Sequence, residues 1–154
     1  MSLELKEENI GGWKLRALEF KNDKKIIKTI FRGELNSSQT KPGKDKKLDQ
    51  QQQITRAIKS KRGSEPRNEL GIYAISLGMN FSQPENQNQP LDIDNFLKPI
   101  FAGIAGGLFS PIDKNPTVDD FQRYDDSRFK YLIVERLDDH ADVEGVAIVI
   151  SEKP

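Results

Sequence analysis

Two aspartates in one short segment, Leu91 to Lys98, are the residues best placed to do chemistry. The segment reads Leu-Asp-Ile-Asp-Asn-Phe-Leu-Lys. If its start is extended, Asp92 and Asp94 project to the same side, because side chains alternate along an extended backbone. Two adjacent carboxylates repel each other, so they share a proton or bind a cation. Hard oxygen ligands of this kind suit Mg²⁺ or Mn²⁺. Lys98 follows one helical turn later, and we expect its ammonium group to point towards the same place.

A second acidic pair, Asp125-Asp126, is followed by Ser127 and then by an expected strand. Taken alone, such a pair is typical of a solvated turn. It becomes a candidate for metal binding only in combination with the first segment.

Other chemistries fit the sequence poorly. A calcium loop beginning at Asp92 would need an oxygen ligand, a glycine and a glutamate where the chain has Phe96, Leu97 and Gly103. The glycines up to Gly107 are not followed by Lys-Ser/Thr, which excludes a phosphate-binding loop of the Walker type. The chain has no cysteine and one histidine, His140, among acidic residues. A Ser-His-Asp or Cys-His centre is therefore not expected.

Together, the two acidic motifs resemble the RusA family of Holliday-junction resolvases. The resemblance rests on Asp92-Ile93-Asp94-Asn95, Lys98 and Asp125-Asp126-Ser127. An expected strand before the first motif and two expected strands after the second agree with it. The resemblance covers roughly residue 25 to the C-terminus.

The resemblance implies an endodeoxyribonuclease that uses Mg²⁺, or Mn²⁺ in its place, to hydrolyse phosphodiester bonds of branched DNA. Such an enzyme acts as a homodimer on Holliday junctions, in DNA recombination and repair. The family's three metal-binding carboxylates correspond to Asp92, Asp94 and Asp126, and its essential lysine to Lys98. Asp125 is a neighbour expected to assist.

A basic segment runs from Lys41 to Arg62, although the whole chain has a formal net charge of zero. Its eight basic residues against Asp45 and Asp49 give +6, whereas the residues from Asp113 onward carry eleven acids and six bases, giving −5. One interpretation is a solvated loop and helix. The other is a surface for DNA phosphates. The DNA-binding candidates are Lys41, Lys44, Lys46, Lys47, Arg56, Lys59, Lys61 and Arg62.

Hydrophobic periodicity predicts five strands and two principal helices. The strands are expected at Trp13–Phe20, Lys25–Leu35, Gly71–Phe81, Phe129–Glu135 and Val143–Ile150, and the helices at Lys46–Lys61 and Asn95 to about Ile104. Asn22-Asp23 has turn chemistry. Asp94 or Asn95 is the expected N-cap of the second helix, Gly106-Gly107 its end, and Pro99 fits only in its first turn. This order predicts an α+β domain with a mixed sheet.

The length of 154 residues favours one domain. We expect residues 1–24 to form an N-terminal extension with the first strand, and residues 25–154 the RusA-like nuclease domain. No apolar run is long enough for a membrane span, and the polar N-terminus is unlike a secretory signal, so the cytoplasm is the expected compartment. Two other functions stay open: a non-catalytic nucleic-acid-binding module on the same scaffold, and a protein-interaction subunit.

Overall fold

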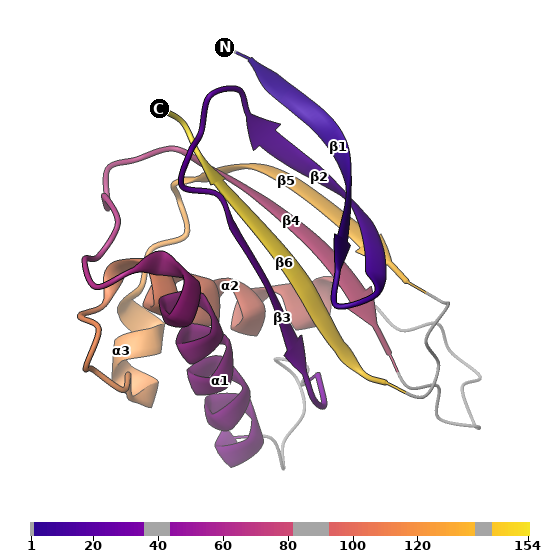
Figure 1. The fold of residues 1–154 in the computed structure, drawn as a ribbon. Coiled ribbons are helices and arrows are strands. Elements are labelled where there is room, and N and C mark those ends of the chain that lie inside the picture. Colours follow the sequence, from indigo (N-terminus) through magenta and orange to yellow (C-terminus); the bar gives the residue numbers. More distant parts are fainter. Residues whose placement is uncertain (1, 36–43, 82–92, 138–142) are drawn as a thin grey trace.

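The computed structural model describes residues 2–35, 44–81, 93–137 and 143–154, which form one α+β domain (Figure 1). The strands are β1 (Leu3–Ile10), β2 (Trp13–Phe20), β3 (Ile27–Arg32), β4 (Tyr73–Asn80), β5 (Phe129–Arg136) and β6 (Gly145–Glu152). The helices are α1 (Lys44–Arg62), α2 (Asp94–Phe109) and α3 (Val118–Arg123). Among these residues no helix is long and apolar enough to cross a membrane.

A four-stranded sheet in the order β3-β6-β4-β5 forms the middle layer. β4 and β5 are parallel, whereas β6 is antiparallel to both β3 and β4. The predicted mixed sheet is therefore confirmed. β4 and β6 are its central strands and are buried almost throughout, which explains their nearly continuous apolar sequence.

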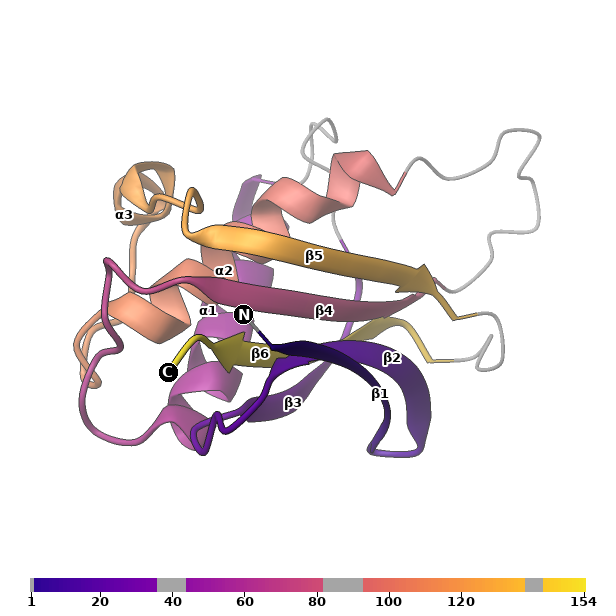
Figure 2. The ribbon, with the colours of Figure 1, turned by 90° about the horizontal axis from the view of Figure 1, so that it is seen from above.

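The helices α1 and α2 cover one face of the sheet, and the β1–β2 hairpin covers the other (Figures 1 and 2). The side chains of β6 alternate between these layers. Val146, Ile148 and Ile150 belong to the core under the helices. Ala147 and Val149 pack with the hairpin residues Ile10, Trp13, Leu15 and Ala17.

Backbone N–H groups at the free edge of β2 donate hydrogen bonds to side chains of the sheet that this strand crosses. Three of its N–H groups donate hydrogen bonds, at 2.6 to 2.8 Å, to one acceptor each from β5, β4 and β6. The pairs are Arg16 with Glu135, Leu18 with Ser76, and Phe20 with Ser151. The backbone of a sheet edge is thereby protected from pairing with another strand.

The glycines of α2 have a different role from the one predicted. The helix does not end at Gly106-Gly107 but continues to Phe109. A Cβ atom on Gly107 would lie 2.6 Å from the Cβ of Ile58, and one on Gly103 would lie 3.0 Å from the Cβ of Ile54. These glycines therefore allow α1 to approach α2 closely.

The prediction was also wrong at the start of α2. Its N-cap is Ile93, which makes no side-chain cap, and Asp94 is the first helical residue. Pro99 lies beyond the first turn, inside the helix, and is buried. Asn22 does lie in a turn, with a φ of 68°, but the strands on either side of it belong to different sheets and do not form a hairpin.

Candidate functional site

The first motif begins α2 at the carboxyl end of β4. Asp94 and Lys98 are exposed and lie one turn apart, while Phe96 between them is buried. The Phe96 ring packs edge-on against Phe81, just past β4, with 4.9 Å between centroids, which fixes the start of the helix. A carboxylate in the first turn is favoured by the helix dipole. Asp92 lies outside the described residues.

The second motif lies between α3 and β5, with Asp125 and Asp126 both exposed. The Asp125 carboxylate accepts hydrogen bonds of 2.8 Å from both the backbone N–H and the hydroxyl group of Ser127. These two bonds lower the pKa of Asp125. The backbone carbonyl of Asp126 accepts from the N–H of Phe129 at 2.9 Å, which leads the chain into β5. Asp125 is thus held as a carboxylate by its own turn.

The two motifs lie at opposite ends of α2 (Figure 2). A Cβ atom on Gly106 would lie 3.3 Å from the Tyr124 ring, so the second motif is beside the last turns of the helix. At a rise of 1.5 Å per residue, Gly106 is about 18 Å along the axis from Asp94. One chain therefore does not bring Asp94 and Asp126 together. Within the described residues no three acidic or histidine side chains are grouped so as to hold a metal ion.

A polar hollow of about 560 Å³ adjoins the second motif. Its charged lining consists of Glu69, Asp125, Arg123, Arg128 and Lys130. Leu70, which is 73% exposed, stands at its margin. We call this the Asp125 hollow. Its three basic groups could hold a phosphate next to the carboxylate oxygens of Asp125 and Glu69.

Comparison with protein families, with curated proteins and with solved structures gives no match to this chain.

The expected DNA-binding residues divide into three groups: those at the surface of α1, those outside the described residues, and those that are buried. Lys46, Arg56 and Lys61 are exposed on α1, and Lys47 is half-buried. Lys46 forms an exposed ion pair with Glu34 at 3.7 Å. Lys41 and the side chain of Lys44 lie outside what the structure describes.

The third group, Lys59 and Arg62, is buried and holds the end of α2. The Lys59 ammonium donates to the carbonyls of Pro111 and Lys114, both at 2.6 Å. The Arg62 guanidinium donates to the carbonyls of Gly107 and Ser110 at 2.9 and 2.6 Å. Burial lowers the pKa of both groups. Their hydrogen bonds serve the fold, because Arg62 satisfies carbonyls at the negative end of α2 and Lys59 satisfies carbonyls of the loop that follows it.

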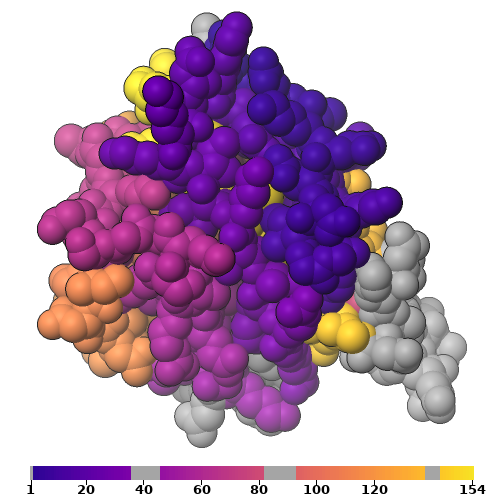
Figure 3. All heavy atoms as spheres, in the orientation of Figure 1, coloured from indigo at the N-terminus to yellow at the C-terminus, as the bar shows by residue number. Residues whose placement is uncertain are grey.

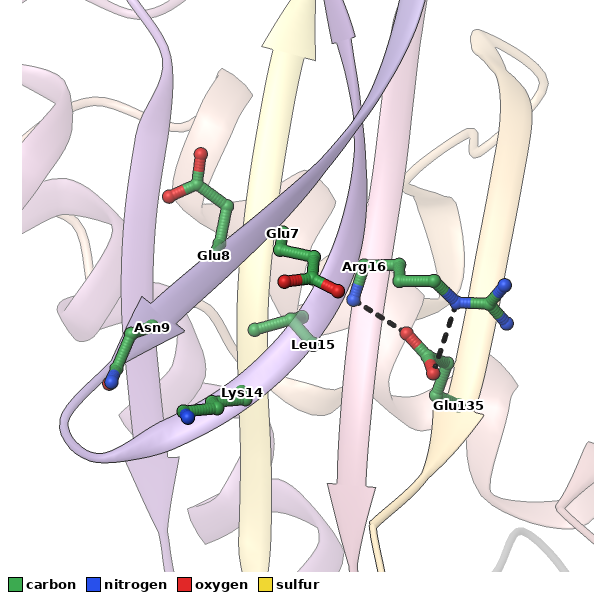
Figure 4. A pocket seen from close by; sticks show the side chains of 7 residues that line it. All are labelled: Glu7, Glu8, Asn9, Lys14, Leu15, Arg16 and Glu135. Carbon is green, nitrogen blue, oxygen red and sulfur yellow. Dashed lines mark hydrogen bonds and ion pairs between the residues drawn. The ribbon is translucent and has the colours of Figure 1, made fainter.

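A second hollow, of about 440 Å³, lies at the β1–β2 hairpin (Figure 4). Glu7 and Glu8 project in different directions, as neighbours on a strand must. Glu8 pairs with Lys28 at 3.0 Å, and Glu135 pairs with Arg16 at 3.3 Å. These carboxylates hold the hairpin to the sheet and do not converge on a common point.

The sequence analysis missed a basic group around the β2–β3 connection. Lys24, Lys25 and Arg67 line one hollow together with Lys61 and Arg62. The Lys24-Lys25 pair was visible as a charge doublet, but Arg67 carried no signal of its own. Their proximity depends on the packing of two loops that are far apart in the sequence.

Proposed function

We propose that this protein is a divalent-metal-dependent endonuclease of branched DNA whose metal site is completed by a second copy of the chain. The observation that carries the proposal is the exposed Asp94–Lys98 turn at the start of α2. It presents a carboxylate and an ammonium group on one face, immediately after Asp92 in the sequence. The Asp125-Asp126-Ser127 motif and the strand–helix order are further support, since both agree with the RusA resemblance.

The need for two copies follows from the distance between the motifs. Ligands lie about 2.1 Å from Mg²⁺, so two carboxylates on one ion must almost touch. Asp94 and Asp126 of one chain lie too far apart for this. In a two-fold symmetric dimer, the start of α2 in one copy can face the start of β5 in the other, and two equivalent sites result. The proposed ligands are Asp92 and Asp94 from one copy and Asp126 from its partner.

Each side chain has a different role in the proposed hydrolysis of the phosphodiester bond. A bound Mg²⁺ supplies Lewis acidity and makes a water molecule more acidic. Lys98 stabilises the negative charge that develops on the phosphate, from a position fixed by the helix. Asp125 keeps the turn that presents Asp126. The basic groups of the Asp125 hollow hold the adjoining phosphates.

The first test is cleavage of a labelled four-way junction and of linear duplex, with Mg²⁺ and with EDTA. We expect the junction alone to be cut, and only with the metal. Asp94→Asn and Asp126→Asn should each abolish cutting, and Lys98→Ala should slow it about 100-fold. Asp119→Asn, at an exposed acid on α3, is the matched control and should cut normally. Unimpaired cutting by Asp94→Asn or Asp126→Asn would refute the assigned site.

The second test mixes Asp94→Asn with Asp126→Asn in equal amounts. If each site takes residues from both copies, a mixed dimer has one intact site and one doubly altered site. About half of the dimers are mixed, so nicking should return to about a quarter of the wild-type rate. If each site lay within one chain, every site in the mixture would stay defective and no activity would return.

A non-catalytic nucleic-acid-binding module is the second candidate. The separation of Asp94 and Asp126 within one chain favours it, because a lone chain then has basic hollows without an assembled metal site. Such a module would bind the junction in the same assays without cutting it under any metal condition.

A further inference from the structure

A hollow of about 470 Å³ between two loops concentrates positive charge on one side of the molecule. Its charged lining is Lys24, Lys25, Lys61, Arg62 and Arg67 against Glu65. We call it the basic hollow. It carries a formal charge of +4 in a chain whose net charge is zero.

The lysines at its margin are available to a ligand. Lys24, Lys25 and Lys61 are exposed, and their ammonium groups form no ion pair within the part of the chain that the structure describes. Exposed, unpaired lysines on a rigid frame are suited to phosphate, which they bind as point charges.

The floor of the basic hollow is rigid. The Arg67 guanidinium forms an ion pair with Glu152 at 3.6 Å and donates to the carbonyl of Lys25 at 3.1 Å, so it ties the two loops together. Arg62 lies beside it, buried and bonded to the end of α2. Burial, and then the positive charge of Arg67, lowers the pKa of Arg62. Arg62 and Arg67 thus form the fixed floor of the hollow, and the exposed lysines stand at its margin.

The position of the basic hollow points to a polyanion. The loop between α1 and β4 lines it through residues 64–67 and lines the Asp125 hollow through residues 69 and 70. In Figure 3 this loop, coloured magenta to pink, lies between the violet β2–β3 connection and the orange segment that includes α3. A chain of phosphates that crosses the loop would therefore meet both hollows in turn.

We infer that the basic hollow binds the phosphodiester backbone of DNA and leads it over the α1–β4 loop to the Asp125-Asp126 turn. This inference rests on the proposed function in taking the polyanion to be DNA, but it does not require cleavage. It also narrows the DNA contact predicted along the whole segment from Lys41 to Arg62 to the end of α1, and adds the β2–β3 connection.

The test is the salt dependence of DNA binding by the full chain, measured by fluorescence anisotropy in EDTA with a labelled duplex. Each lost phosphate contact lowers the slope of log K against log salt by about 0.9. Lys61→Gln should lower the slope by that amount, and the triple variant at Lys24, Lys25 and Lys61 by about 2.7. Lys14→Gln removes an exposed lysine from the hairpin and should leave the slope unchanged.

Equal slopes for wild type, Lys61→Gln and the triple variant would overturn the inference, as would a wild-type protein that binds no duplex at low salt. Melting temperatures show that each variant is folded. The outcomes for the two proposals are separable. Salt-dependent binding through the basic hollow without cleavage leaves this inference standing and removes the nuclease. If the triple variant cuts DNA and binds it with the same salt dependence as wild type, the nuclease proposal stands and this inference fails.

Discussion

The buried carboxyl group of Glu19 makes the stability of the hairpin depend on pH. Glu19 is 3% exposed, and its Oε2 atom has no hydrogen-bond partner within the described residues. Burial raises its pKa to about 7, with help from the hydrogen bond and the negative charge of Glu8. The pKa of Glu8 is lowered, chiefly because Glu19 donates that bond, and Lys28 adds to the effect. Between the lowered pKa of Glu8 and the raised pKa of Glu19, the pair therefore holds one proton.

The sign of the effect follows from proton linkage. Between the unfolded pKa of 4.5 and the folded value of about 7, the folded chain keeps the Glu19 proton that the unfolded chain has lost. Stability must then fall as pH rises through this window. A difference of this size corresponds to at most about 3.4 kcal/mol, and sharing of the proton with Glu8 makes the observed value smaller. Below pH 4.5 the lowered pKa of Glu8 acts in the opposite direction, so stability also falls towards acid.

Glu19→Gln tests this reasoning, because glutamine keeps a donor for Glu8 and cannot ionise. We expect it to raise the free energy of unfolding by about 1–3 kcal/mol at pH 8 and to change it little at pH 5. Urea denaturation at both pH values measures the difference. Glu7→Gln, at an exposed position on β1, should have no such dependence. A Glu19→Gln protein that is destabilised at pH 8, or changed equally at both pH values, would show that Glu19 is ionised when folded.

Two further predictions concern the α1–α2 contact. Gly107→Ala places a methyl group 2.6 Å from the Cβ of Ile58 and should lower the unfolding free energy by about 1–3 kcal/mol in urea denaturation. Arg62→Met leaves two carbonyls at the end of α2 without their buried donor and should cost about 1–3 kcal/mol, whereas Arg56→Met on the exposed face of α1 should stay within about 0.5 kcal/mol.

The sequence was informative where burial dictates composition. β4 and β6 are central strands with helices on one face and the hairpin on the other, so their apolar runs were unmistakable. β1 was missed because most of its side chains are exposed. A strand with little buried surface has no obligatory pattern.

α3 was missed although it carries a signal. Thr117 and Asp120 form a reciprocal capping box at its start. The pattern of Thr followed three residues later by an acid is readable in a sequence. A helix of six residues has too few apolar positions to display a period, so only the cap could have predicted it.

The basic segment shows why charge counts alone cannot define a binding surface. Lys59 and Lys61 are two residues apart in sequence and carry the same charge. Lys59 is buried against carbonyls of the loop after α2, whereas Lys61 faces solvent beside the β2–β3 connection. Only the position of α1 against α2 distinguishes these roles, and that position depends on glycines that the sequence suggested as a helix end.

The separation of the two acidic motifs is a consequence of topology. β4 and β5 are parallel, and Tyr73 at the start of β4 is opposite Phe129 at the start of β5. Residues that follow β4 and residues that precede β5 must then lie at opposite ends of strands that extend for about 23 Å. α2 runs from the end of β4 back towards the start of β5 and so separates the two motifs.

The turn before β5 is anchored to the hydrophobic core at its end. Phe129 is held by ring contacts with Phe101 and Phe109 at 6.0 and 6.5 Å, so Asp126 is anchored three residues from a fixed point. If Asp94 and Asp126 bind one metal ion, as we propose, the two carboxylates would therefore have to come from different chains. The mixture of Asp94→Asn and Asp126→Asn therefore tests the topology as well as the chemistry. If wild type cuts and the mixture does not, Asp126 and Asp94 do not share a metal ion across a dimer, and the proposed two-copy site is refuted.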